Sequence, residues 1–113
     1  MPPYGGLGTG STSGNSTNTY ATILDKEVAK FKRHTLIITE TGATNGVTFQ
    51  IHIKMREANT YRPLGTSTTD IAIAAGATQV VVIEADVGFI RVQHKSTVAD
   101  SAGTTEVQYG GTV

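Results

Sequence analysis

The sequence has no cysteine and no tryptophan, and only 16% of its 113 residues are charged. Without cysteine, the chain can form neither a disulfide nor a thiolate metal site. Nine Lys and Arg residues balance nine Asp and Glu residues, and this neutrality argues against a polycation that binds nucleic acid. No apolar run approaches the ~20 residues that span a bilayer, and the first residues do not form a signal peptide. Neither nucleic acid nor membrane is therefore an expected partner.

Threonine and glycine are abundant instead, with 19 and 13 copies. Threonine favours strands and glycine favours turns, while good helix formers never gather with a helical period. The length suits one domain with appendages. Seven or eight short strands joined by Gly-containing turns predict an all-β fold, an antiparallel β-sandwich of jelly-roll or immunoglobulin-like type.

Residues 1–19 differ from the rest, because they are almost wholly Gly, Ser, Thr, Asn and Pro. Such a segment has too little apolar surface to offset the entropy lost on ordering. We therefore expect a flexible N-terminal arm over 1–19, ordered only across a neighbouring subunit, and a β-sandwich domain over 20–113. The large apolar side chains of the arm, Tyr4 and Leu7, and Tyr20 directly after it are the expected anchors. Deleting the arm is predicted to leave a folded sandwich with a nearly native melting temperature.

The strongest local pattern lies in residues 47–55, where apolar and polar side chains alternate without a break. The apolar positions are Val47, Phe49, Ile51, Ile53 and Met55. Alternation predicts a strand with one buried face and one exposed face, the latter carrying His52. The β-branched segment 33–41 precedes it, and Asn45-Gly46 between the two predicts a hairpin turn with positive φ.

Other segments are less regular. Pro63 limits residues 60–64 to an edge strand or a strand end. Residues 25–31 are either a short helical turn or a charged crossover, and the crossover is favoured. Residues 78–84 have a continuous apolar centre, which predicts burial on both faces or a contact with another copy of the chain.

Catalytic and metal-binding patterns are missing. His34, His52 and His94 show no HxH or HxxxH spacing, so we interpret them as structural or surface residues, with His94 on the inward side of its strand. The aspartates are isolated, and the sequence contains neither a GxSxG motif nor a P-loop lysine. The sequence therefore predicts no enzymatic activity, no cofactor and no metal.

Basic residues concentrate in one place, at Lys30, Lys32 and Arg33. They are either a contact for an acidic partner or the solvated end of a strand, protected by charge against aggregation. Together with Tyr4, Leu7 and Tyr20 they complete the candidate interface.

Three segments carry a family resemblance: TLIITETGATNGVTFQIHIK (35–54), IAIAAGATQVVVIEA (71–85) and GFIRVQHKSTVADSAGTTEVQYGGT (88–112). With the Gly/Ser/Thr arm before them, they resemble the small β-sandwich structural proteins of tailed-bacteriophage virions, the head decoration and auxiliary proteins. Such proteins often end in an aromatic-Ile/Val-Arg-Val strand, here Phe89-Ile90-Arg91-Val92, followed by a small-residue loop and a last strand.

This resemblance implies a non-enzymatic virion protein that decorates or cements a capsid. Its partners would be copies of itself, as a homo-oligomer, and a major capsid or other virion protein. The resemblance also leaves a second hypothesis, a phage tail or surface module that binds host glycan. The sequence has no tryptophan for stacking against a sugar, and this disfavours the second hypothesis.

Overall fold

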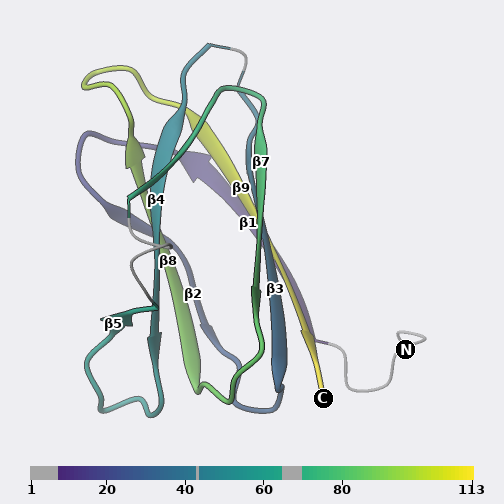
Figure 1. Ribbon diagram of the computed structural model, residues 1–113. Coiled ribbons are helices and arrows are strands. Elements are labelled where there is room, and N and C mark those ends of the chain that lie inside the picture. The colour runs from purple at the N-terminus through teal and green to yellow at the C-terminus, as the bar shows by residue number, and fades with distance from the viewer. Residues whose placement is uncertain (1–7, 43, 65–69) are drawn as a thin grey trace.

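The computed structural model describes residues 8–42, 44–64 and 70–113, and it is a sandwich of two antiparallel sheets (Figure 1). Sheet A has the strand order β1-β9-β3-β7, and sheet B has the order β2-β8-β4-β5, with β6 also paired to β4. The strands are β1 (Gly8–Asn15), β2 (Ala21–Glu27), β3 (Arg33–Glu40), β4 (Val47–Lys54), β5 (Arg62–Pro63), β6 (Ile71–Ile73), β7 (Thr78–Ile83), β8 (Phe89–Ser96) and β9 (Thr104–Thr112). The predicted all-β sandwich is confirmed.

Consecutive strands mostly alternate between the two sheets. Strands β1, β3, β7 and β9 lie in sheet A, while β2, β4, β5, β6 and β8 lie in sheet B. This winding is that of a jelly roll, the first of the two predicted sandwich types. Within the part of the chain that the structure describes, no helix is long and apolar enough to cross a bilayer.

The core lies between the sheets and is built from alternate residues of the long strands. Leu36 and Ile38 of β3, Phe49 of β4 and Ile90 of β8 are fully buried. Val28, Val47, Ile51, Ile73, Ile83, Val87, Val92, Val107 and Tyr109 complete the buried apolar cluster. The core is aliphatic for the most part, with Phe49 and Tyr109 as its buried aromatic residues.

The alternation in β4 is confirmed on its inner face, where Val47, Phe49 and Ile51 are fully buried. Four positions differ from the expectation. Thr48 is buried on the face that was expected to be exposed, and Ile53 is half-buried on the face that was expected to be buried. Met55 lies beyond the end of β4 and is exposed, and His52 is buried although it points away from the core. His52 is covered because Arg91 and the edge strand β5 lie beside it.

The predicted hairpin between β3 and β4 is wrong, because β3 belongs to sheet A and β4 to sheet B. The segment around Asn45-Gly46 crosses between the sheets instead. Among the described residues, Gly76 is the glycine with positive φ, at 75°. Gly46 is needed for space, since a Cβ there would lie 2.6 Å from the carbonyl oxygen of Ile73.

Residues 25–27 also differ from the expectation of a crossover. They form the second half of β2, and the chain turns only afterwards, where the amide of Phe31 donates to the carbonyl of Val28. Pairing with β8 explains the strand, because Asp25 lies opposite Arg91 and Lys26 opposite Ile90.

The N-terminal segment is only partly as expected. Residues 1–7, with Tyr4 and Leu7, lie outside the described residues. Gly8–Asn15, however, form β1 and pair with β9 of the same chain over their whole length. The prediction that the whole of 1–19 lacks order of its own is therefore corrected for β1, which is held by backbone hydrogen bonds that need no apolar side chains.

Candidate functional site

The edge strand β7 is the most conspicuous surface feature of sheet A. Its six residues, TQVVVI, include no charge, proline or glycine. Val80 and Val82 are 53% and 46% exposed on the outer face. Among the described residues β7 pairs with β3 alone, so its other side presents free N–H and C=O groups. An uncharged, apolar free edge is a template for pairing with another chain.

The strand at the opposite edge of sheet A is β1. It carries glycine, serine, threonine and asparagine, with no charge and no proline. Ser11 and Ser13 point to the outer face and are exposed, while Gly10, Thr12 and Gly14 are half-buried. Among the described residues, sheet A therefore has a strand without charge or proline at each of its edges.

Sheet B is built differently at its edges. Strand β2 carries Asp25, Lys26 and Glu27, and Lys26 turns back towards the Tyr109 ring, 5.7 Å from its centroid. At the other edge, β5 contains Pro63 and has two residues, and β6 has three. Charges, proline and short strands are the devices that prevent edge-to-edge association. Sheet B has all three, whereas the edges of sheet A have none of them.

The outer face of sheet A carries small and polar residues together with the apolar side chains of Ile37, Val80 and Val82. Residues paired across the strands form rows on this face. One row consists of Ser11, Gln108, Ile37 and Val80, and a neighbouring row consists of Gly110, Thr35 and Val82. Its one ion pair among the described residues is at its end, where Arg33 and Glu84 lie 3.4 Å apart. Such a face suits contact with a second protein surface better than the binding of a charged small molecule.

The predicted interface residues do not form one patch. Lys30 and Lys32 are exposed in the β2–β3 turn beside Arg33, and the Lys32 amide donates to Thr112. Tyr20 directly precedes β2, at the opposite end of that strand. The proposed basic contact and the proposed aromatic anchor are thus about one strand length apart, roughly 23 Å.

The outer face of sheet B instead carries two tyrosines, Tyr20 and Tyr61, which no local sequence pattern connects. Tyr20 donates a hydrogen bond to Asp70, and the Lys95 ammonium lies 4.7 Å from the Tyr20 ring centroid. Gln50 also donates to Asp70, at 3.1 Å. Burial, and then the hydrogen bond to Asp70, raise the pKa of Tyr20 well above its ordinary value. The hydrogen bonds from Tyr20 and Gln50 in turn lower the pKa of Asp70.

Tyr61 makes an equivalent arrangement further along the same face. Its hydroxyl donates to Asp25 at 2.5 Å, and its ring lies over Lys54 and Arg91, with centroid distances of 4.5 and 4.4 Å. An Arg91 Nη lies 3.4 Å from Nδ1 of His52. Burial, and then the Arg91 charge, lower the pKa of His52. Burial, and then the hydrogen bond to Asp25, raise the pKa of Tyr61.

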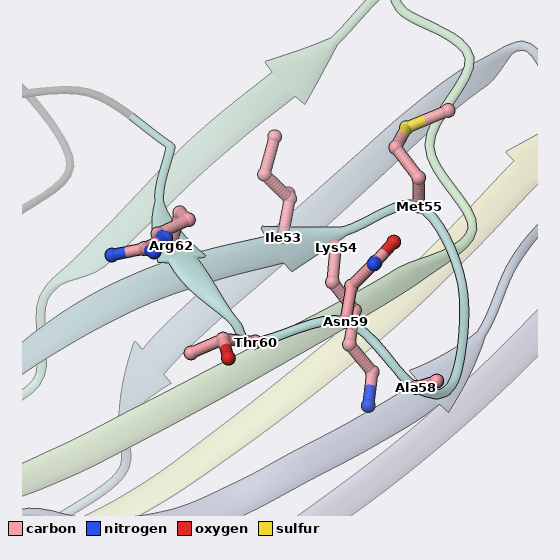
Figure 2. Close-up of a pocket in the computed structure, with 7 residues that line it drawn as sticks. All are labelled: Ile53, Lys54, Met55, Ala58, Asn59, Thr60 and Arg62. Carbon is pink, nitrogen blue, oxygen red and sulfur yellow. The ribbon is translucent and has the colours of Figure 1, made fainter.

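A hollow of about 560 Å³ lies beside the β4–β5 turn (Figure 2). Its lining residues are Ile53, Lys54, Met55, Ala58, Asn59, Thr60 and Arg62. Figure 2 shows Ile53 and Met55 on one side of the strand and Lys54 on the other. The lining offers cations and amides but no carboxylate or imidazole, so it has no group suited to general acid or base catalysis near neutral pH.

His94 is buried and has a structural environment. Nδ1 of His94 lies 2.8 Å from Oγ1 of Thr105 inside the sandwich, which confirms the inward orientation predicted for His94. In the described part of the chain, no three His, Asp or Glu residues gather as they would around a metal ion.

The known structures that are similar to this chain share its fold, but they are proteins of different kinds. No protein-family model matches the sequence, and no curated protein matches it. A structure of Bacillus endospore appendages, described as disulfide-linked pili, is similar with a TM-score of 0.55 and 14% identity, over 96% of this chain and 89% of that one. The crystal structure of PirA is similar with a TM-score of 0.61 and 13% identity, over 88% of this chain and 92% of that one.

A weaker likeness is to the VP2 subviral particle of infectious bursal disease virus. Its TM-score is 0.46 at 10% identity, over 94% of this chain and 32% of that one, and so low a score carries no argument. At these identities the two stronger matches establish the shared β-sandwich and nothing about activity.

Proposed function

We propose that the protein is a non-enzymatic structural subunit that assembles with copies of itself through sheet A. The observation that carries this proposal is the uncharged edge strand β7, with Val80 and Val82 exposed beside free backbone groups. Residues 78–84 were expected either to be buried on both faces or to contact another copy. Their outer face is open in the single chain, which favours the second alternative.

The likeness to an endospore appendage subunit supports this proposal, since that structure is described as a pilus. The absence of cysteine here means that no disulfide can link copies of this chain. The contacts that we propose are non-covalent. Six residues of strand pairing give about six hydrogen bonds, each worth a net ~0.5–1.5 kcal/mol, against an association cost of at least ~4 kcal/mol. One such contact is weak, and the assembly must depend on concentration and on repeated contacts.

The finer form of the proposal is that this assembly decorates and cements a viral capsid, located on the virion and bound to a major capsid protein. It rests on the resemblance of residues 31–111 to head decoration proteins of tailed phages. Lys30, Lys32 and Arg33 would then face an acidic surface of the shell, and Tyr4, Leu7 and Tyr20 stay the predicted anchors. Co-sedimentation of the protein with intact virus particles tests this form directly. Sedimentation of the protein in buffer without particles is the control.

Self-assembly is tested by light scattering after size exclusion and by electron microscopy over a range of protein concentrations. The wild-type chain should form species larger than a monomer, and Val80→Lys should shift them towards the monomer. Val98→Lys is the matched control, because Val98 is 64% exposed but lies in the β8–β9 loop. A wild-type chain that stays monomeric at every concentration would overturn the proposal.

A second candidate function, glycan binding, is favoured by one observation, the two tyrosine rings on the outer face of sheet B. Lys95 lies under Tyr20 and Arg91 under Tyr61, so the rings are spaced by about four residues of β8, roughly 13 Å. Gln50 of β4 and Gln93 of β8 lie opposite each other in the sheet, between the two rings. Aromatic rings separated by amides suit a neutral oligosaccharide. Glycan-array binding that Tyr61→Ala abolishes would support this role.

A further inference from the structure

The direction of the strands in sheet A determines how two copies can join. Each neighbouring pair in the order β1-β9-β3-β7 is antiparallel, so β7 runs opposite to β1. A second copy in the same orientation therefore places its β1 antiparallel to the β7 of the first copy. Antiparallel pairing is the arrangement that the rest of the sheet already uses.

From this topology we propose that β7 of one copy pairs with β1 of the next, so that sheet A continues from subunit to subunit. This inference rests on the proposed self-assembly and names its partner surface. Because the two joined surfaces differ, the contact is heterologous and repeats, giving an open filament or a closed ring.

The side chains of the two edges fit this pairing. On β7 the outward residues Val80 and Val82 are bulky and exposed, whereas Ser11 and Ser13 on β1 are small. Neither strand carries a charge, so no repulsion opposes the contact. The lengths also match, since the six residues of β7 fit within the eight of β1.

Pairing of β7 with β7 is the competing arrangement. It would close a symmetric dimer and would leave β1 of both copies as an unprotected edge. Head-to-tail pairing covers both edges of every interior subunit. It also explains why sheet A lacks the charges and proline that sheet B carries at its edges.

The test uses two complementary variants of the full chain. One carries Val80→Lys and Val82→Lys on β7, and the other carries Ser11→Lys and Ser13→Lys on β1. All four side chains are exposed, so both variants should fold, and their melting temperatures and circular dichroism spectra serve as the check. Each variant alone should associate at least about tenfold more weakly than the wild-type chain. The wild-type chain should form assemblies larger than a dimer.

Mixing the two variants gives the decisive result, because each still has one intact edge. The mixture should form a one-to-one complex of twice the chain mass of 11.8 kDa and nothing larger. Association of the β1 variant with itself, or wild-type assembly that ends at a dimer, would overturn the head-to-tail pairing in favour of β7 with β7. Wild-type assembly that neither variant weakens would overturn the pairing while leaving self-assembly intact. A monomeric wild type would overturn both.

Discussion

Nδ1 of His34 and the hydroxyl of Tyr109 lie 2.6 Å apart in the core, joining β3 to β9 by their side chains. The other ring nitrogen, Nε2, lies 3.2 Å from the carbonyl oxygen of Ala85. A carbonyl only accepts, so Nε2 carries the proton of the neutral ring and Nδ1 accepts from the tyrosine. Burial raises the pKa of Tyr109 to about 12, which keeps that hydroxyl protonated as a donor.

Tyr109→Phe should therefore lower the free energy of unfolding by about 1–3 kcal/mol, because it leaves the buried Nδ1 of His34 without a donor. Chemical denaturation measures this loss. Tyr61→Phe is the control, since it removes an exposed hydrogen bond to Asp25 and should cost well under ~1 kcal/mol. Equal losses in the two variants would contradict the buried pairing.

The stability should fall as the pH drops below about 6.5. Burial is the largest cause that lowers the pKa of His34, His52 and His94 in the folded chain. In the unfolded chain these rings take up protons below about pH 6.5, while the folded chain resists doing so, and protonation therefore favours unfolding. The contribution of the neutral rings is complete above that pH and is lost progressively below it.

Melting temperatures between about pH 7.5 and 5.5 test this dependence. His94→Gln, which keeps a polar group near Thr105, should make the decline shallower than in the wild type. A wild-type melting temperature that rises on acidification over this range would contradict the proposed environments of the three rings.

Some of this architecture follows from local sequence, whereas the rest depends on pairing between segments that are distant in the sequence. The inner face of β4 was predictable because Val47, Phe49 and Ile51 alternate with polar residues within one strand. The sheet to which β4 belongs was not predictable, because it depends on pairing with β8, about 40 residues later. The Asn45-Gly46 signal is local, and it therefore suggested a hairpin where the chain crosses between the sheets.

The two tyrosine contacts on sheet B show the same limit. Tyr20 and Asp70 are 50 residues apart in the sequence, and Tyr61 and Asp25 are 36 apart. Nothing near any of these residues indicates the partner. For β7, by contrast, the apolar run alone indicated a contact with another copy as one of two alternatives, and the structure added which face is open.

Gly103→Ala should destabilise the sandwich by about 1–3 kcal/mol. A Cβ at this position would lie 2.2 Å from Oε2 of the fully buried Glu40 and 2.8 Å from Cγ1 of Val47. Gly110→Ala is the matched control, because a Cβ there meets no atom within 4 Å. Thermal melts that shift equally for both variants would contradict the close packing around Glu40.

Deleting residues 1–15 should lower the free energy of unfolding by about 1–3 kcal/mol, in contrast to the nearly native melt that the composition of the arm predicted. The deletion removes β1, exposing the edge of β9 and its backbone groups along eight pairs. It keeps Ser16, whose buried hydroxyl accepts from the Gly103 amide at 2.8 Å. For a domain of this size each 1 kcal/mol corresponds to roughly 4–8 °C in Tm, so calorimetry resolves the effect. Deletion of residues 1–7 is the control, because it leaves β1 intact. If both deletions melt at the same temperature, β1 contributes nothing to the sandwich and the predicted nearly native melt stands.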